Sequence, residues 1–407
     1  MTSHDPDRRL PGDDPAYDPG AAAAEPASAP EAGRLVPAAQ EHLEAMLGDI
    51  QRLVEVETPS SDPGAVAAGA QHVAQLLRDQ LGRDPEVLVI DGVTHLRMRF
   101  GSGPASVVLL NHQDTVWPLG TVARLPFSQV DGVLRGPGVF DMLTGLVMSV
   151  HAVAILTEQG CDLDGLSILV TSDEEVGSLS SRELIVSEAA EARAVYVMEA
   201  AAGRSLKVAR KGIAMYTVLV HGRAAHAGLE PEKGINAGVA LGELLPHISA
   251  LGDADRGTTV TPTVISAGTT ANTIPSRAQV SVDSRAATIE EQQRVDQEIR
   301  SLCSTREGAS VEVLGGVNRP PMERRATHGL FAQAQRVAAE LGLEPLSAVG
   351  VGGGSDGNFT AGRGIPTLDG LGAVGDGAHA EHEHALVGEI APRTALLAGL
   401  IRDQLGR

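Results

Sequence analysis

The sequence predicts an α/β fold, and three observations support that prediction. Short apolar runs with the length of buried strands alternate along the chain with longer segments of helical periodicity. Three of these runs, at 105–110, 166–170 and 194–198, are followed directly by polar or acidic residues. Hydrophobic residues make up 43% of the chain and are mainly Ala, Val and Leu, whereas aromatic residues make up only 2%. This composition suits an enzyme-like sheet packed with small aliphatic side chains.

The chain has 407 residues, whereas one domain usually has about 100–200, so we expect two domains. Residues 1–36 are rich in Pro, Ala, Asp and Glu without periodicity, and this composition predicts a disordered tail. We expect a first domain made of residues 37–206 and 320–407, interrupted by an inserted domain at 207–319.

The first domain is expected to begin with helices and to continue with alternating strands and helices. Apolar residues at helical spacing predict one helix that ends near Glu57, before Thr58-Pro59. The predicted elements are, in chain order, helices at 37–57 and 63–82, strands at 86–90, 95–100 and 105–110, a helix at 144–158, strands at 166–170 and 194–198, and, after the inserted domain, helices at 328–341 and 389–405.

The hydrophobic pattern of the sequence changes near Lys207. The segments VARKGIAMYTVLVHG, TTVTPTVISAG, AQVSVDSRA and SVEVLG alternate as strands do, and 230–251 and 289–303 have helical patterns. Four strands with two helices on one face make an α+β arrangement, which fits a separate inserted domain.

Composition excludes several classes of function. The formal net charge of −20 argues against nucleic-acid binding, which needs clustered Lys and Arg. We expect no membrane span, because we interpret no run of the sequence as approaching the roughly 18 apolar residues that a span needs. The N-terminus contains acidic residues and prolines and therefore does not resemble a signal peptide. These features predict a cytoplasmic protein. With only Cys161 and Cys303, a metal would have to be held by His, Asp and Glu.

Six ionisable residues follow predicted strands or lie in loops of the first domain: His112, Asp141, Glu174, Glu175, Glu199 and His379. Each has a simple structural explanation by itself. A lone histidine after a strand can be a hydrogen-bonded loop residue, Asp141 can cap a helix, and the glutamate pair can be a solvated helix start.

Taken together, these residues have the chemistry of a metal centre. Histidine and carboxylate side chains suit zinc or another first-row divalent ion. Two metals about 3.5–4 Å apart can share one carboxylate, and four carboxylates with two histidines supply enough ligands. One carboxylate is then left over to act as a general base on a metal-bridging water.

Six motifs resemble, in the same order, those of the dinuclear zinc peptidases and amidohydrolases. This family includes carboxypeptidase G (glutamate carboxypeptidase), acetylornithine deacetylase, succinyl-diaminopimelate desuccinylase and aminoacylase. The resemblance extends from about residue 40 to the C-terminus. It implies a mixed-sheet, phosphorylase/hydrolase-like catalytic domain and an inserted four-stranded, two-helix domain that serves as a dimerisation or lid domain. The motifs are HQDT (112–115), GPGVFDM (136–142), TSDEEVGS (171–178), MEA (198–200), GRAAHAG (222–228) and GAHAEHE (377–383).

The resemblance implies two metal sites that share one ligand. Glu174 would be the general base, and Asp114 would accept the far ring N–H of His112 and so orient that ligand. The expected metal is zinc, with cobalt or manganese as alternatives. The metals would polarise the scissile carbonyl and activate the bridging water, whose proton Glu174 would take and return to the leaving nitrogen. The implied ligands are His112, Asp141 and Glu199 for one ion and Asp141, Glu175 and His379 for the other.

The same resemblance implies roles for four residues of the inserted domain. His226 would stabilise the oxyanion in the active site of the partner subunit of a homodimer, although on its own it could be an exposed loop histidine. Asn272, Arg285 and Arg319 would contact the substrate, because the planar fork of arginine suits a carboxylate. A solvated surface position is the alternative for both arginines.

Two features depart from the family pattern. The family often has Asp-Met-Lys-Gly-Gly or Asp-Asp-Lys-Gly-Gly where this chain has DMLTG at 141–145, so a lysine and one glycine are missing. The segment near the C-terminus also carries extra histidines, His382 and His384. We prefer His379 as the ligand because Glu383 follows it by four residues, and His384 is the alternative.

The motifs ARKGI, GRAAHAG and NRPPME resemble most closely the glutamate-carboxypeptidase branch. We therefore expect hydrolysis of an amide bond in N-acyl amino acids or peptides with a free C-terminal carboxylate. The alternatives are an amino acid deacetylase or aminoacylase, an aminopeptidase or dipeptidase, and a non-catalytic binding relative.

Overall fold

The computed structural model describes residues 34–406. Within this range the chain divides into two compact units. The large unit contains residues 34–208, 324–349 and 355–406, and the small unit contains 209–323 and 350–354. Residues 1–33 of the predicted tail lie outside the described residues. Its predicted end at residue 36 was slightly too late, because Leu35 already belongs to the first helix.

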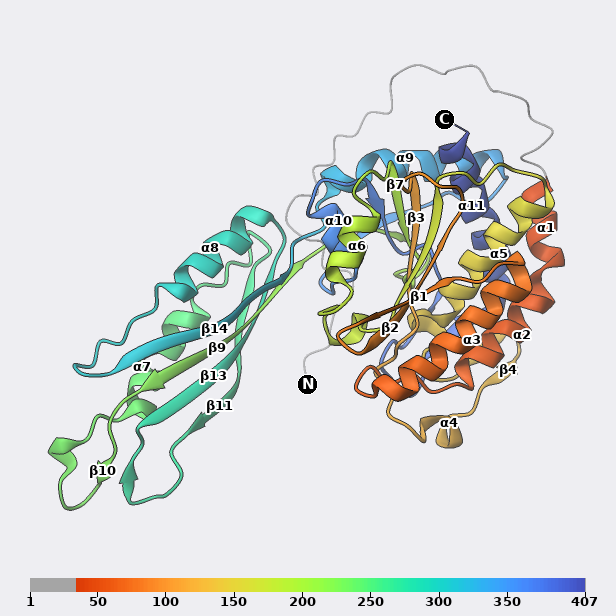
Figure 1. Cartoon of the computed structure of the whole chain (residues 1–407). Helices are drawn as coiled ribbons and strands as arrows, with labels where there is room; N and C mark the ends of the chain where they lie inside the picture. The colour runs from red at the N-terminus through yellow and green to blue at the C-terminus, as the bar shows by residue number, and fades with distance from the viewer. Residues whose placement is uncertain (1–33, 407) are drawn as a thin grey trace. The chain divides into compact units, whose positions relative to one another are not determined.

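The large unit is built on a six-stranded mixed sheet (Figure 1). Its four strands β6, β3, β7 and β16 are parallel, whereas β2 is antiparallel to β6 and β1 is antiparallel to β2. This arrangement confirms the α/β prediction. In sheet order the strands are β1 (Glu86–Ile90), β2 (Val93–Arg99), β6 (Leu166–Thr171), β3 (Val107–His112), β7 (Ala194–Val197) and β16 (Thr367–Leu368).

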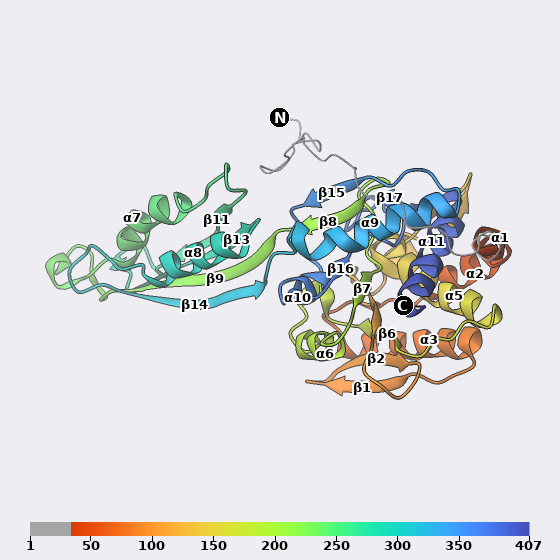
Figure 2. The same ribbon diagram turned by 90° about the horizontal axis from the view of Figure 1, so that it is seen from above.

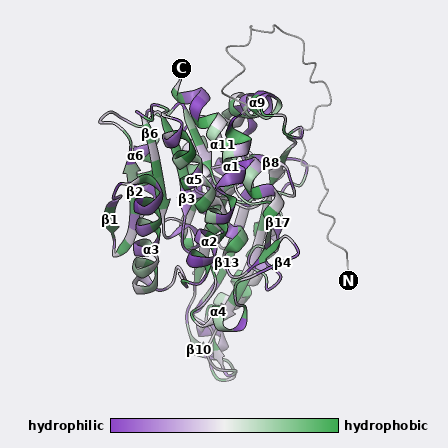
Figure 3. Cartoon of the chain, turned by 90° about the vertical axis from the view of Figure 1, so that its right-hand side faces the viewer, coloured by the Kyte–Doolittle hydropathy of each residue, from purple (hydrophilic) through white to green (hydrophobic). Residues whose placement is uncertain are grey.

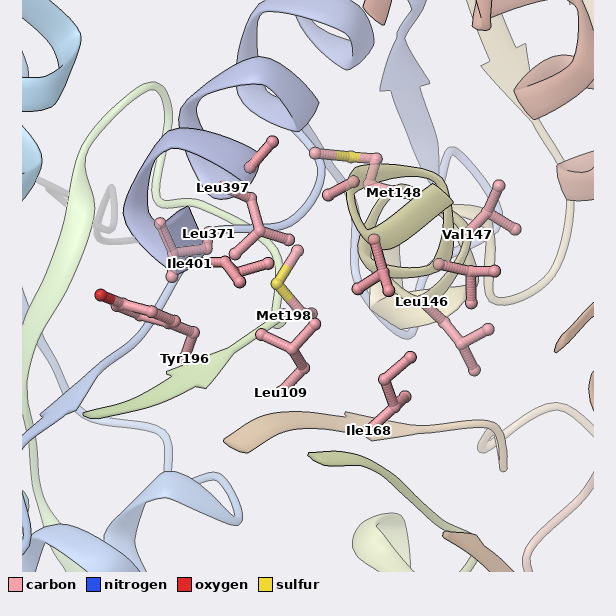
Figure 4. Packing of buried hydrophobic residues seen from close by; sticks show 14 of the residues in the cluster. Leu109, Leu146, Val147, Met148, Ile168, Tyr196, Met198, Leu371, Leu397 and Ile401 are labelled. Atoms are coloured by element: carbon pink, nitrogen blue, oxygen red, sulfur yellow. The ribbon is translucent and has the colours of Figure 1, made fainter. Parts of the chain in front are cut away.

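Helices cover both faces of this sheet, because its central strands are apolar on both sides. Along β3, Val107 and Leu109 face one hydrophobic cluster, whereas Val108 and Leu110 face the other. Figure 4 shows the first cluster, where Leu109 lies with residues of α5 and α11. Figure 3 marks the hydrophobic residues in green. The first cluster includes α1 (Leu35–Glu41), α2 (Leu43–Val54), α3 (Pro63–Leu81), α5 (Thr144–Glu158), α9 (Arg324–Glu340) and α11 (Val387–Leu405), and the second includes α6 (Arg182–Glu188) and α10 (Gly357–Ala361).

The predicted single helix at 37–57 is interrupted at His42, between α1 and α2. The two ring nitrogens of His42 lie 3.1 Å from Nδ1 of His151 and 3.0 Å from Oε2 of Glu158, both on α5. These tertiary contacts accompany the break, which local periodicity could not show.

Helix α5 corrects one expectation from the sequence. The stretch Val139–Glu158 is long and apolar enough to span a membrane, judged by length and composition alone. However, 94% of its apolar window is buried inside the structure. The stretch therefore has the features of a core helix, and the sheet and α11 pack against it.

Smaller elements complete the large unit. A four-stranded antiparallel sheet has the order β17-β18-β5-β4. Strands β8 and β15 pair with each other, and each begins in the large unit and ends in residues of the small unit. The bounds of these elements are β17 (Gly375–Asp376), β18 (His384–Leu386), β5 (Val133–Arg135), β4 (Ser128–Val130), β8 (Leu206–Arg210), β15 (Ala348–Val351) and the short helix α4 (Thr121–Arg124).

The small unit has an antiparallel sheet of order β11-β13-β9-β14 with α7 and α8 on one face (Figures 1 and 2). The predicted helix at 230–251 begins later, because Asn236 caps it by accepting a hydrogen bond from the Val239 N–H at 3.0 Å. The elements are β9 (Gly212–His221), β11 (Thr259–Ala267), β13 (Arg277–Ala286), β14 (Ser310–Arg319), α7 (Ala237–Ser249), α8 (Ile289–Arg300) and a two-stranded antiparallel sheet of β10 (Ala225–His226) and β12 (Thr273–Ile274).

Candidate metal centre

Three parallel strands of the large unit end at the same edge of the sheet. In the register of β3 with its neighbours, His112 pairs with Thr171 of β6. His112 is the last residue of β3. Glu174 and Glu175 lie in a short turn after β6. Glu199 follows β7 by two residues. The carboxyl edge of a parallel sheet is where ligands bind in open α/β folds, and the chain places imidazole and carboxylate groups there.

The structure brings the five predicted ligands into two groups of three that share Asp141. In the first, Nε2 of His112 lies 3.4 Å from Oδ1 of Asp141 and 3.6 Å from Oε1 of Glu199. In the second, Nε2 of His379 lies 3.5 Å from Oδ2 of Asp141 and 3.2 Å from Oε2 of Glu175. Each oxygen of Asp141 thus faces a different group.

These groups fit a pair of divalent cations. Nε2 of His112 and Oδ1 of Asp141 are buried and have no hydrogen-bond partner among the residues that the structure describes, although they lie only 3.4 Å apart. Two ligand atoms at about 2.0–2.2 Å from one tetrahedral zinc ion are roughly 3.3–3.6 Å from each other. The separation and the missing partners are those expected of two atoms that bind the same ion.

The histidines of the two groups are surrounded by carboxylates. The pKa of His379 rises to about 10, because its ring is hydrogen-bonded to Asp141 and also to Glu175. Burial raises the pKa of the Glu175 carboxyl, and His379 acts against this rise. Since a metal ligand must be deprotonated on the binding nitrogen, metal and protons compete for this centre.

The orientation of His112 differs in one detail from the implied arrangement. Its Nδ1 lies 3.0 Å from the backbone carbonyl oxygen of Asp114, whereas Oδ1 of the Asp114 carboxylate is 3.5 Å away. That carboxylate accepts hydrogen bonds from Ser60 Oγ (2.6 Å) and from the backbone N–H groups of Glu174 (3.3 Å) and Glu175 (3.2 Å). Asp114 therefore ties the loop after β3 to the acidic turn after β6.

Burial alone would lower the pKa of His112, but Asp114, Asp141 and Glu199 together raise it well above its usual value.

Glu174, the predicted base, is buried next to Glu175 and belongs to neither ligand group among the described residues. The alternative ligand His384 lies on β18, where its Nδ1 is 3.0 Å from the backbone oxygen of His382. The structure thus brings His379 into the centre rather than His384.

Sequence reasoning assigned no role at the centre to two residues, Lys207 and Glu383. Nζ of Lys207 lies 4.0 Å from Oε2 of Glu199. Burial would raise the pKa of Asp141, but His112 and His379 lower it, and the charge of Lys207 adds to their effect. Glu383 accepts hydrogen bonds from the turn that carries Asp141. Burial raises the pKa of Glu383, and these N–H donors oppose the rise. The signal for Glu383 was its place in the GAHAEHE motif, whereas nothing in the sequence singled out Lys207.

The four candidate residues of the small unit form two separate pairs. On β10, His226 pairs with Thr273 of β12, and the carbonyl of the neighbouring Asn272 accepts the Ala227 N–H at 2.9 Å. Arg285 and Arg319 flank the same position of β9, Ile213. Ile213 lies near the start of β9, and the strand continues for eight more residues, roughly 27 Å, to His221. Strand β10, which carries His226, lies beyond that end (Figure 1), so the two pairs are roughly 30 Å apart within one subunit.

The two arginines differ in their surroundings. Arg285 is partly exposed, and its Nη2 forms an ion pair at 2.9 Å with Oδ2 of Asp283 on the same strand. Arg319 is 5% exposed, and its Nη1 lies 3.4 Å from Oδ1 of Asn318. Arg285 therefore has a carboxylate partner already, which a substrate carboxylate would have to share or replace.

Comparison with known proteins places this site in a family context. The chain is 28% identical over 383 residues to carboxypeptidase G2 of Pseudomonas sp. (strain RS-16), covering 91% of each chain. Aminopeptidase PepT from Bacillus cereus has a similar structure, with a TM-score of 0.70, 23% identity and coverage of 89% of this chain and 99% of that one. The YXEP protein of Bacillus subtilis, described as a dinuclear metal-binding peptidase from the M20 family, matches with a TM-score of 0.61, 17% identity and coverage of 90% and 99%.

The model of peptidase family M20/M25/M40 matches residues 108–403. This range includes both ligand groups and the whole inserted segment. The chain therefore belongs to peptidase family M20/M25/M40 and is a metallopeptidase or amidohydrolase.

Proposed function

We propose that this enzyme cleaves the amide bond of N-acyl amino acids or peptides that have a free C-terminal carboxylate. The observation that carries the proposal is the pair of ligand groups joined by Asp141. The similarity to carboxypeptidase G2, which extends over 91% of both chains, supports a carboxypeptidase-like substrate. We expect zinc in both positions, with cobalt or manganese as alternatives.

Two divalent ions held by these residues would polarise the scissile carbonyl and lower the pKa of a bound water. In this proposal Glu174 receives the proton of the attacking water and delivers it to the leaving nitrogen. Its backbone N–H is fixed by Asp114, and its neighbour Glu175 is a ligand, so the turn holds the base close to the reacting atoms.

His226 is proposed to donate a hydrogen bond to the oxyanion. Its Nδ1 accepts hydrogen bonds from the backbone N–H groups of Gly228 and Leu229, both at 3.1 Å. In the neutral ring the proton is then on Nε2, which makes the exposed nitrogen a donor. We assign His226 to the active site of the partner subunit in a homodimer.

Asn272, Arg285 and Arg319 are proposed substrate contacts, with the arginines binding the free carboxylate. One small substrate cannot reach His226 and Arg319 of the same subunit, because their pairs lie roughly 30 Å apart along β9. The proposed site therefore combines one pair from each of two subunits. The cytoplasmic location expected from the sequence stays a prediction.

The deciding experiment is hydrolysis by zinc-reconstituted protein of a matched panel: N-acyl amino acids, their C-terminal amides, and dipeptides with a free amine. We expect cleavage of the free acids, with KM raised strongly for the amides, and no cleavage after chelation. Equal cleavage of acids and amides would refute carboxylate recognition. Cleavage of free-amine dipeptides alone would favour the aminopeptidase alternative.

A further inference from the structure

The turn that carries Asp141 is bound by a buried carboxylate from a distant part of the chain. Glu383 follows His379 by four residues, and its side chain is buried, with only 3% of the residue exposed. It accepts four hydrogen bonds, two on each oxygen. The donors are the backbone N–H groups of Phe140 (2.9 Å) and Asp141 (3.1 Å) on Oε1, and the backbone N–H of Gly138 (3.0 Å) and the indole N–H of Trp117 (2.8 Å) on Oε2.

This set of donors requires a carboxylate at position 383. An ionised carboxylate offers about four acceptor positions, and the four donors fill them. An amide in the same place would turn its NH₂ group toward two N–H donors and would leave buried donors without an acceptor, which costs about 1–3 kcal/mol each. A glutamine of the same size therefore cannot replace Glu383.

The four bonds join three segments, and each of these segments supplies a member of the ligand groups. Trp117 lies five residues after His112, the turn at 138–141 ends with the shared residue Asp141, and Glu383 belongs to the segment of His379. Through one side chain, the backbone positions of three ligands become linked. Glu383 also bonds the N–H of Asp141 itself, so it acts on the shared ligand directly.

We propose that Glu383 is a positioning residue that fixes the turn at 138–141 in the geometry that Asp141 needs to bind both ions. The inference rests on the proposed function in treating Asp141 as the shared ligand. It adds that the backbone of this turn must be held by the Glu383 carboxylate, which itself contacts neither an ion nor the substrate.

The experiment compares Glu383→Gln with a matched control, Glu57→Gln. Glu57 also accepts backbone N–H groups from the loop after β3, those of Gly120 (2.7 Å) and Val122 (2.8 Å). Zinc affinity and stoichiometry are measured by calorimetry and elemental analysis. We expect Glu383→Gln to weaken zinc binding by about 10–100-fold, the effect typical of residues that orient metal ligands. Glu57→Gln should bind zinc as the wild type does.

Trp117 is the only tryptophan of the chain, so its fluorescence reports on the bond to Glu383. The emission maximum should shift in Glu383→Gln. Wild-type zinc affinity in that variant, or an unchanged emission maximum, would overturn the inference. If wild-type protein failed to bind two ions, the proposed function would fail instead.

If Glu383→Gln does not fold, wild-type protein freed of metal by a chelator provides the test. The amides of Gly138, Phe140 and Asp141 should still be protected from hydrogen exchange by at least about 100-fold, because Glu383 and not the metal holds them. Exchange of these amides at the rate of an unstructured peptide would show that the metal organises the turn, and the inference would be wrong.

Discussion

Glu174 and Glu175 are neighbours in the sequence but have different surroundings in the structure. Oε2 of Glu175 lies 3.2 Å from Nε2 of His379 and Glu175 belongs to a ligand group, whereas Glu174 belongs to neither group found within residues 34–406. We predict that Glu174→Gln lowers kcat by about 10²–10⁴-fold, as expected for loss of a general base, while two metal ions per chain remain. Activity assays paired with elemental analysis check this prediction. Loss of one ion from the variant would mean that Glu174 is a ligand.

The residue scale also shows what the sequence could and could not predict. His112, Glu175 and Glu199 were predictable, because each follows a recognisable apolar strand within a characteristic motif. The contacts of Asp114 with two backbone N–H groups after β6 were not, since they join loops 60 residues apart. The nearest acceptor for the His112 ring is likewise a main-chain oxygen, which no motif specifies.

Helix α5 starts against the end of β7, and Gly145 makes that approach possible. A Cβ atom at Gly145 would lie 2.0 Å from the backbone oxygen of Met198, the residue before Glu199. We predict that Gly145→Ala destabilises the protein by about 1–3 kcal/mol and weakens zinc binding, because the end of β7 must move. Urea unfolding and zinc titration measure the two effects.

The control for this substitution is Gly242→Ala in helix α7. Apart from the chain neighbours and the backbone of its own helix, a Cβ atom there would have no atom of the described residues within 4 Å, so alanine should be neutral or should stabilise the helix by roughly 0.5–1 kcal/mol. Similar stability of the two variants would contradict the close-approach argument. The chain thus has Gly145, the glycine that the packing requires, although its DMLTG segment (141–145) lacks the second glycine of the family pattern.

The small unit contains a carboxylate whose titration should affect stability. Glu291 on α8 accepts hydrogen bonds from Arg294 (2.8 Å), Arg256 (2.8 Å) and Thr258 (3.0 Å). Its bond to Arg294 is the main reason that its pKa falls from 4.5 to about 2. Because the folded pKa is depressed, the ionised carboxylate stabilises the fold above about pH 4.5, and this contribution is lost as the pH falls toward 2.

We therefore predict that Glu291→Gln is less stable than wild type at pH 6, by on the order of 1 kcal/mol, and that the difference shrinks toward zero near pH 2. Thermal unfolding at several pH values checks this. The exposed Glu298 on the same helix provides the control, and Glu298→Gln should leave stability at pH 6 unchanged. A difference for Glu291→Gln that persists at pH 2 would contradict the assignment.

At the scale of elements, periodicity located the strands of both units but misplaced some helix ends. The pattern at 230–251 includes residues that fold as a short turn, Pro231–Lys233, before the cap at Asn236. Similarly, the break at His42 accompanies bonds to α5, about 110 residues away in the sequence. Local sequence patterns do not contain such long-range contacts.

At the scale of the whole molecule, the ligand centre is complete within the large unit, whereas His226 belongs to the small unit. The order of the motifs predicted both parts. Only the structure showed that Arg319 pairs with the start of β9, whereas His226 lies on β10, which follows the other end of β9. This separation gives the proposed homodimer a role in catalysis, because one subunit would supply His226 and the other Glu174 and the ligands.

Subunit complementation tests that arrangement. His226→Ala should lower kcat by about 10²-fold or more, the effect of losing an oxyanion donor, without loss of metal. Glu174→Gln should also be nearly inactive. In a dimer of the two variants, the His226→Ala subunit keeps Glu174 and receives an intact His226 from its partner, so one of the two sites is restored. Random exchange makes about half of the dimers hybrid, so the mixture should regain about a quarter of wild-type activity. If His226 acted within its own subunit, each site would lack one residue and mixing would restore nothing.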